Sequence, residues 1–152
     1  MKKWRTYQVD DELEDSWLES LNTPKNLKLA SVCTGHDDSK NNLNYPHATY
    51  YSNFKVDEKT WLIIDRHLTE LLPDVSKDGI SLFFDMLYCH PDHEELYKDE
   101  IWPNAVWVAF RTKQKWDLSE FFGYCTDTIM EIDALLGILK PSLSLPITHN
   151  TC

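Results

Sequence analysis

Glycine is scarce in this chain, with four residues among 152. Loops that cradle phosphate through backbone amides need closely spaced glycines, and neither a P-loop segment nor a Gly-x-Gly-x-x-Gly segment is present. A Gly-x-Ser-x-Gly nucleophile turn is also absent. These absences argue against P-loop NTPases, dinucleotide-binding enzymes of the Rossmann type and α/β-hydrolases.

A long apolar run and a basic cluster are missing as well. Runs such as 105–110 are too short to span a bilayer, and no apolar stretch follows Lys2 and Lys3, as a signal peptide would require. Acidic residues outnumber basic ones by 25 to 15, so the net charge of −10 repels phosphate backbones. We therefore expect a soluble cytoplasmic protein with reduced cysteines and neither nucleic-acid nor membrane partners.

The residues that are present suit one globular domain. Hydrophobic residues make up 42% of the chain and aromatic residues 12%, a content that a disordered chain would lack. A length of 152 residues fits one domain better than two. We predict a single α+β domain over 1–152.

Apolar periodicity divides the chain into alternating helices and strands. Apolar residues at spacings of three and four predict helices, whereas β-branched and aromatic alternation predicts strands. Pro73 is expected to end the second helix. The predicted helices cover 10–22, 57–72 and 116–139, and the predicted strands cover 27–33, 48–56, 80–88 and 105–111. The expected core includes Trp17, Phe83 and Cys125.

The order of these elements, αββαββα, predicts a four-stranded antiparallel sheet with helices on one face, which is a permuted ferredoxin-like arrangement. Segments 10–56 and 57–112 resemble each other, with 116–139 as a closing helix. Each segment carries a Cys, a His and a Pro at an offset of 56 or 57 residues. Such self-similarity indicates two duplicated αββ units, although chance matches in an aromatic-rich chain are the alternative.

Two polar loops carry the candidate ligand-binding residues. Cys33 and His36 follow the first strand, and Cys89, His90, Asp92 and His93 follow the third. Thiols and imidazoles bind soft metals or titrate near neutral pH. Zinc is the candidate metal, with four tetrahedral ligands in Cys33, His36, Cys89 and His93. Right-handed crossovers place the two loops at opposite ends of the sheet, so a shared site requires a homodimer or a different fold. The alternative is that both are solvated connections.

Three functions remain open at this stage. The first is a small binding or regulatory domain for a small molecule or a protein, favoured by long polar loops on a compact scaffold. The second is a metal-dependent zinc hydrolase that uses the Cys/His loops. The third is an acidic interaction or inhibitor protein. Whether the chain is an enzyme is not decided by the fold class, because small α+β scaffolds host all three functions.

Overall fold

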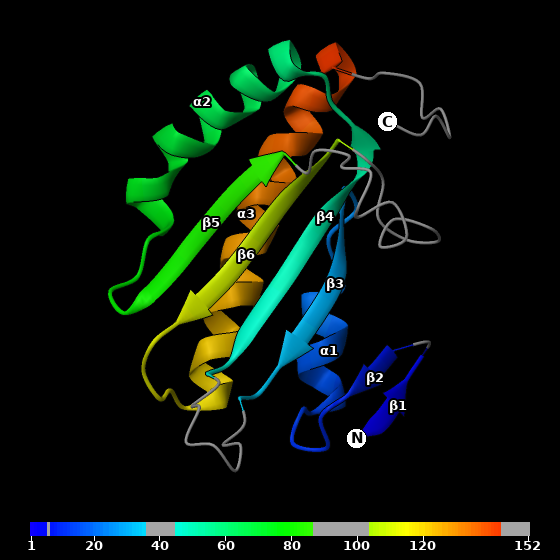
Figure 1. Cartoon of the computed structure of the whole chain (residues 1–152), viewed down its shortest axis with the longest axis vertical. Coiled ribbons are helices and arrows are strands. Elements are labelled where there is room, and N and C mark those ends of the chain that lie inside the picture. The colour runs from blue at the N-terminus through cyan, green and yellow to red at the C-terminus, as the bar shows by residue number, and fades with distance from the viewer. Residues whose placement is uncertain (6, 36–44, 87–103, 144–152) are drawn as a thin grey trace, which may run out of the picture.

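A computed structural model describes residues 1–5, 7–35, 45–86 and 104–143. The described residues form three helices and six strands, which Figure 1 labels in chain order. The strands are β1 (Lys2–Trp4), β2 (Tyr7–Val9), β3 (Leu27–Cys33), β4 (His47–Lys55), β5 (Ile80–Met86) and β6 (Ala105–Thr112). The helices are α1 (Asp15–Leu21), α2 (Glu58–Val75) and α3 (Leu118–Leu143).

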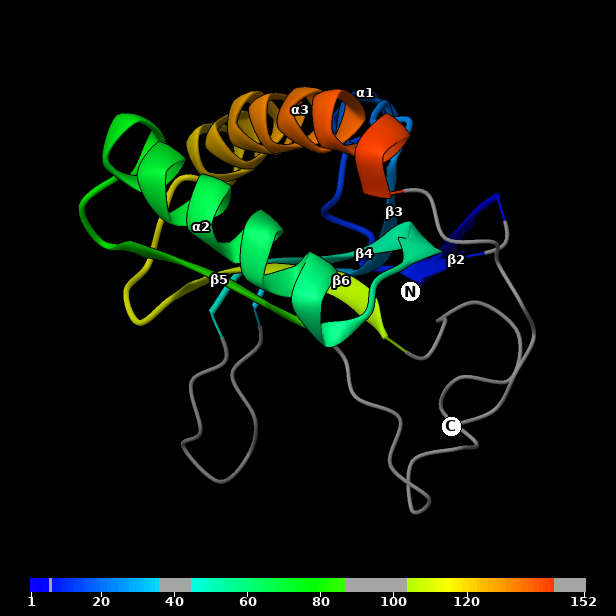
Figure 2. The same ribbon diagram turned by 90° about the horizontal axis from the view of Figure 1, so that it is seen from above.

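The main sheet has four strands in the order β3-β4-β6-β5, and each neighbouring pair is antiparallel. All three helices lie on one face of this sheet (Figure 2). The α+β class and the antiparallel sheet are thereby confirmed. The strand order is the one that circular permutation of a ferredoxin-like sheet produces, because β4 and β5 run parallel on either side of β6 and α2 joins them. The duplication of 10–56 and 57–112 is not established by this topology and stays a prediction.

Strand alternation divides the sheet residues between the helices and the opposite face. Tyr50 of β4 pairs with Val108 of β6, and both are buried beneath the helices. The Tyr50 hydroxyl donates to the carbonyl oxygen of Leu21 at 2.6 Å, which ties the sheet to the end of α1. The core also receives the inner faces of the long helices, with Ile64, Leu68, Phe121, Phe122, Cys125, Ile129, Ile132 and Leu136.

Helix α2 begins where the sequence predicts and ends later than predicted. The Asp57 side chain accepts a hydrogen bond from the Thr60 amide at 2.6 Å, which satisfies one free amide of the first turn. Pro73, expected to end the helix, lies inside it. The helix tolerates this proline because only two more residues follow, so the missing amide removes a single hydrogen bond near the end. Helix α3 likewise continues past 139, to Leu143.

A two-stranded hairpin, β1–β2, precedes α1 and was not predicted. Helix α1 begins at Asp15 rather than at residue 10, and ion pairs join it to the hairpin. Lys2 contacts Asp15 at 3.1 Å and Arg5 contacts Glu19 at 3.0 Å. Exposed pairs of this kind contribute at most about 1 kcal/mol each. Their structural effect is to hold the tip of the hairpin beside α1.

Two predictions about the core need correction. Phe83 was expected to be buried, but 48% of it is exposed. It pairs with Ala109 on the face away from the helices, whereas its neighbours Leu82 and Phe84 pack against the core. Trp17 is only partly buried, because it lies at the edge of the core against Phe122. Cys125 is fully buried, as predicted.

A buried carboxylate joins α3 to the start of β3. Asp133 accepts hydrogen bonds from the backbone amides of Lys25 at 3.1 Å and Asn26 at 2.7 Å. These hydrogen bonds to Asp133 fix the backbone that enters the edge strand β3.

Within the described part of the chain, no helix is long and apolar enough to cross a membrane.

The assigned core predicts a contrast between two leucines of α2. Leu68 is 2% exposed and Leu62 is 61% exposed. We expect Leu68→Ala to lower the free energy of unfolding by about 2–5 kcal/mol, since it removes buried methyl groups and leaves a cavity. The matched change Leu62→Ala should cost less than about 0.5 kcal/mol. Chemical denaturation of both variants measures the difference, and equal losses would show that the packed face of α2 is misassigned.

Candidate ligand-binding face

One face of the main sheet has no helix over it among the described residues (Figure 2). We call it the open face. Because successive strand residues alternate between faces, its side chains are those that do not point toward the helices. The open face comprises Lys28, Ser31, Cys33, His47, Thr49, Tyr51, Ser81, Phe83, Asp85, Trp107, Ala109 and Arg111.

The strand register arranges these side chains in three rows across the sheet. Opposed residues in such rows have Cβ atoms about 4.5–5.5 Å apart. The first row is Lys28, Tyr51, Trp107 and Asp85. The second row is Ser31, Thr49, Ala109 and Phe83. The third row is Cys33, His47, Arg111 and Ser81.

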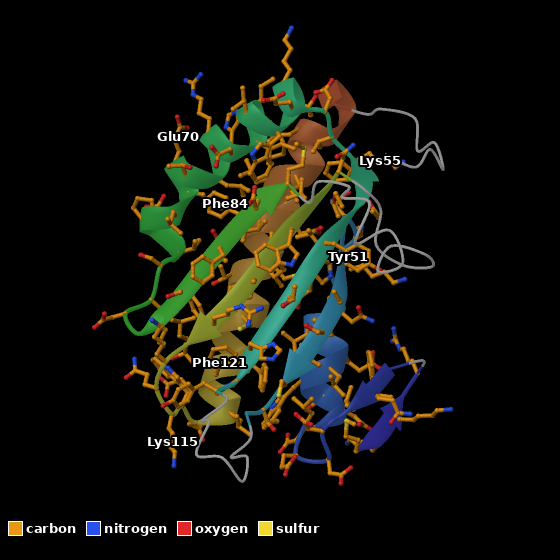
Figure 3. All side chains as sticks on the ribbon, viewed as in Figure 1. Tyr51, Lys55, Glu70, Phe84, Lys115 and Phe121 are labelled. Carbon is orange, nitrogen blue, oxygen red and sulfur yellow. The ribbon has the colours of Figure 1, made fainter. Side chains whose placement is uncertain are left out.

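The aromatic rings on the open face differ in how exposed they are to a ligand. Tyr51, in the middle of β4 (Figure 3), is 1% exposed. Trp107 is half-buried, and 48% of Phe83 is exposed. Ala109 lies between these two rings. It pairs with Phe83 across the strands and is two residues from Trp107 along β6. Ala109 itself is fully buried, so the surface that a flat group could contact here is the exposed part of the two rings.

The open face also carries two exposed cations. Arg111 is exposed at the end of β6, and Lys28 is exposed near the start of β3. Neither makes an ion pair with another residue that the structure describes. An exposed guanidinium can bind a carboxylate or a phosphate through two parallel hydrogen bonds. The Arg111 end of the open face is therefore suited to an anionic group.

Cys33, a predicted site residue, lies in the third row beside His47. The thiol sulfur accepts a hydrogen bond from the Gly35 amide at 3.4 Å. Gly35 has a φ of 95°, a conformation that favours glycine. Next to it, the Asp10 carboxylate accepts from both the amide and the hydroxyl of Thr34, at 2.9 and 3.1 Å. Asp10 thereby joins the end of the hairpin to the end of β3.

The surroundings of Cys33 raise the pKa of its thiol. Burial is the largest cause, and the Asp10 and Glu12 carboxylates add to it, while the Gly35 amide opposes it. Desolvation and nearby negative charge both disfavour a thiolate. Cys33 is therefore a protonated thiol at neutral pH, which is not the state of an activated nucleophile.

Five of the six predicted site residues fall outside the described part of the chain. His36, Cys89, His90, Asp92 and His93 lie outside the described residues, and the predicted zinc site stays a prediction. Among the described residues, no three His, Cys, Asp or Glu side chains form a group that could hold a metal ion.

The two strands that precede the loops finish at opposite ends of the sheet. Cys33 ends β3 in the row that contains Ser81, whereas Met86 ends β5 at the far end of β6, opposite Val106.

His47 and Arg111 were not singled out from the sequence. Strand pairing places His47 beside Cys33 and Arg111 beside His47, and each is an isolated residue in its own segment. Strand alternation is the signal that could have found them. Each lies an odd number of positions from a core-facing residue of its strand, Tyr50 or Phe110, and so faces the opposite side of the sheet.

Comparisons with protein-family models, with curated proteins and with solved structures gave no match to this chain.

The setting of Cys33 predicts how its reactivity depends on pH. We expect Asp10→Asn to lower the pKa of Cys33, because it removes the negative charge that raises this pKa most while keeping a carbonyl acceptor for Thr34. Alkylation by iodoacetamide should then become faster at a fixed pH near 8, since a larger share of the thiol is ionised. Mass spectrometry of the Cys33 peptide at several pH values measures the shift.

The matched control is Glu12→Gln, which removes one negative charge that contributes less to the pKa of Cys33. It should shift the labelling profile less than Asp10→Asn does. A profile that is unchanged in Asp10→Asn would contradict the assigned cause.

Proposed function

We propose that the chain is a small binding domain that takes its ligand on the open face. The supporting observation is the register between β5 and β6, which puts Arg111, without an ion pair among the described residues, on the same face as the accessible rings of Phe83 and Trp107. Exposed aromatic side chains beside an uncompensated cation favour binding more than folding.

The arrangement favours a flat ligand with one anionic group. Phe83 opposes Ala109, so it is a diagonal neighbour of Arg111, at about 7–8 Å between strand positions. Trp107 and Arg111 lie on one strand about 13 Å apart. A planar organic acid about one or two rings long would place its ring on Phe83 or Trp107 and its carboxylate or sulfonate on Arg111.

Anilinonaphthalene sulfonate combines a flat aromatic system with one negative charge, so it serves as a probe. We expect its fluorescence to rise with the native full-length chain. Arg111→Gln should weaken binding by about 1 kcal/mol, or roughly fivefold in Kd, since an exposed charge pair contributes about that much. Trp107→Ala should weaken binding as well, because it removes a stacking surface.

Arg66→Gln is the matched control. Arg66 is an exposed arginine on α2, where it contacts Glu70 at 3.4 Å, and it lies on the helical side of the molecule. It should leave probe binding unchanged. If Arg111→Gln and Arg66→Gln bind the probe equally well, or if the native chain binds none, the proposed binding face is wrong.

The zinc hydrolase is the alternative from a different class. It needs Cys33 as a thiolate ligand together with His36, Cys89 and His93. The raised pKa of Cys33 weighs against it, because zinc binding would have to displace the thiol proton in the field of Asp10 and Glu12. Elemental analysis of the purified chain separates the two functions. We expect no stoichiometric zinc, and one zinc per chain, lost on Cys33→Ser, would favour the hydrolase.

The acidic interaction protein has less support. Acidic residues are concentrated around α1, where a basic partner would have to bind. Ion pairs with the hairpin already occupy three of them, with contacts of 3.6 Å for Asp11, 3.1 Å for Asp15 and 3.0 Å for Glu19. A basic partner would need to displace these contacts, so charge alone does not favour this function.

A further inference from the structure

A second surface feature lies at the start of the edge strand β3, away from Arg111. It is a cavity of about 410 Å³ between the hairpin tip, the α1–β3 connection and the end of β4. Its volume is in the range of small-ligand sites. Its polar lining consists of Arg5, Lys25, Lys28, Asn22 and Asn53. We call it the basic cavity.

The charge of the basic cavity is opposite to that of the whole chain. Among the described residues, three cations and no carboxylate line it, in a protein with a net charge of −10. Lys25 and Lys28 make no ion pair with any described residue. Arg5 alone is partly compensated, by Glu19 at 3.0 Å. Like charges gathered at one place repel each other, so an anion bound among them would relieve that repulsion.

The walls of the basic cavity are held in place by contacts that do not use the cationic groups of the two lysines. The Arg5 guanidinium is anchored by Glu19 and stacks on the Trp4 ring at 4.5 Å. The Lys25 amide donates to the buried Asp133 carboxylate at 3.1 Å, and its carbonyl accepts from the Asn53 side-chain amide at 2.8 Å. No described residue therefore competes with a ligand for either ammonium group, and these hydrogen bonds fix the backbone beneath them.

Asn53 adds a hydrogen-bonding preference. Its side-chain nitrogen must face the Lys25 carbonyl, because two carbonyl oxygens cannot share a hydrogen bond. The amide oxygen is buried and accepts no hydrogen bond from a described residue. Such an acceptor favours a hydroxyl or amino donor. Because the oxygen is buried, a ligand hydroxyl reaches it only when a lining side chain moves aside.

We propose that the basic cavity binds a phosphorylated small polyol, with the phosphate among Arg5, Lys25 and Lys28 and a hydroxyl group toward Asn53. A guanidinium fork and two ammonium groups suit a doubly charged phosphate. The cavity is larger than a phosphate alone requires, and Asn22 and Asn53 are uncharged partners for hydroxyl groups. This site is independent of the proposed ligand on the Arg111 end of the open face.

The test is calorimetric titration of the full-length chain at low salt with glycerol 3-phosphate, inorganic phosphate and glycerol. We expect glycerol 3-phosphate to bind more tightly than inorganic phosphate, and glycerol not to bind. Affinity should fall as salt is added, because the lysines are exposed and screened. Equal affinity for inorganic phosphate and glycerol 3-phosphate would overturn the polyol assignment, and no binding of either phosphate would overturn the site.

Charge-matched variants distinguish a built site from general attraction. Lys25→Gln with Lys28→Gln should weaken glycerol 3-phosphate binding roughly tenfold, as loss of two exposed charge contacts implies. Both side chains are exposed, so this variant should fold. Lys113→Gln with Lys115→Gln removes the same charge at the other end of the sheet, where Figure 3 shows Lys115. Equal weakening by both pairs would overturn the proposal, and Arg111→Gln should leave this binding unchanged.

Discussion

The pairing of β4 with β6 at the centre of the sheet is the constraint on which the rest of the molecule depends. Tyr50 and Val108 oppose each other in this pairing and both face the helices. Their neighbours Tyr51 and Trp107 must then face the opposite side, because strand side chains alternate. A slip of one residue would turn Arg111 into the core, where an unpaired charge is strongly unfavourable. One register therefore decides both the composition of the core and the side chains that a ligand can meet.

Local patterns were enough to predict the main sheet and its helices, because periods of two and 3.6 residues persist through each long element. They were not enough where an element is short or its face is ambiguous. The strands of the hairpin have three residues each, and ion pairs such as Lys2 with Asp15 hold it against a helix that follows in the chain. In β5, Phe83 and Phe84 are adjacent aromatics. Hydrophobicity marks both as core, and only the alternation that starts at Ile80 separates them.

Only those residues of the candidate site whose chemical type is conspicuous, such as a cysteine, could be predicted from the sequence. Cys33 is recognisable as a thiol after a strand, but its pKa is raised by burial and then by Asp10, which is buried at the end of the hairpin that the sequence patterns missed. His47 and Arg111 join Cys33 through pairing across two strand boundaries. Cross-strand neighbours have no fixed spacing along the chain, so a search for short motifs does not find them.

The net charge of the chain is negative, but the charged side chains assigned to ligand binding at both proposed sites are cations. Acidic residues of α1 are paired with the hairpin, as Glu19 is with Arg5. The cations that remain without ion pairs among the described residues include Lys28 and Arg111, which lie on the open face. Charges on an exposed surface act over a screening length of about 8 Å at physiological salt. An anion within that distance of Arg111 therefore responds mainly to the nearby guanidinium, and the distant acidic residues that dominate the total charge contribute little. Overall acidity consequently argues against binding a long phosphate backbone, while it leaves small anions free to bind at these cations.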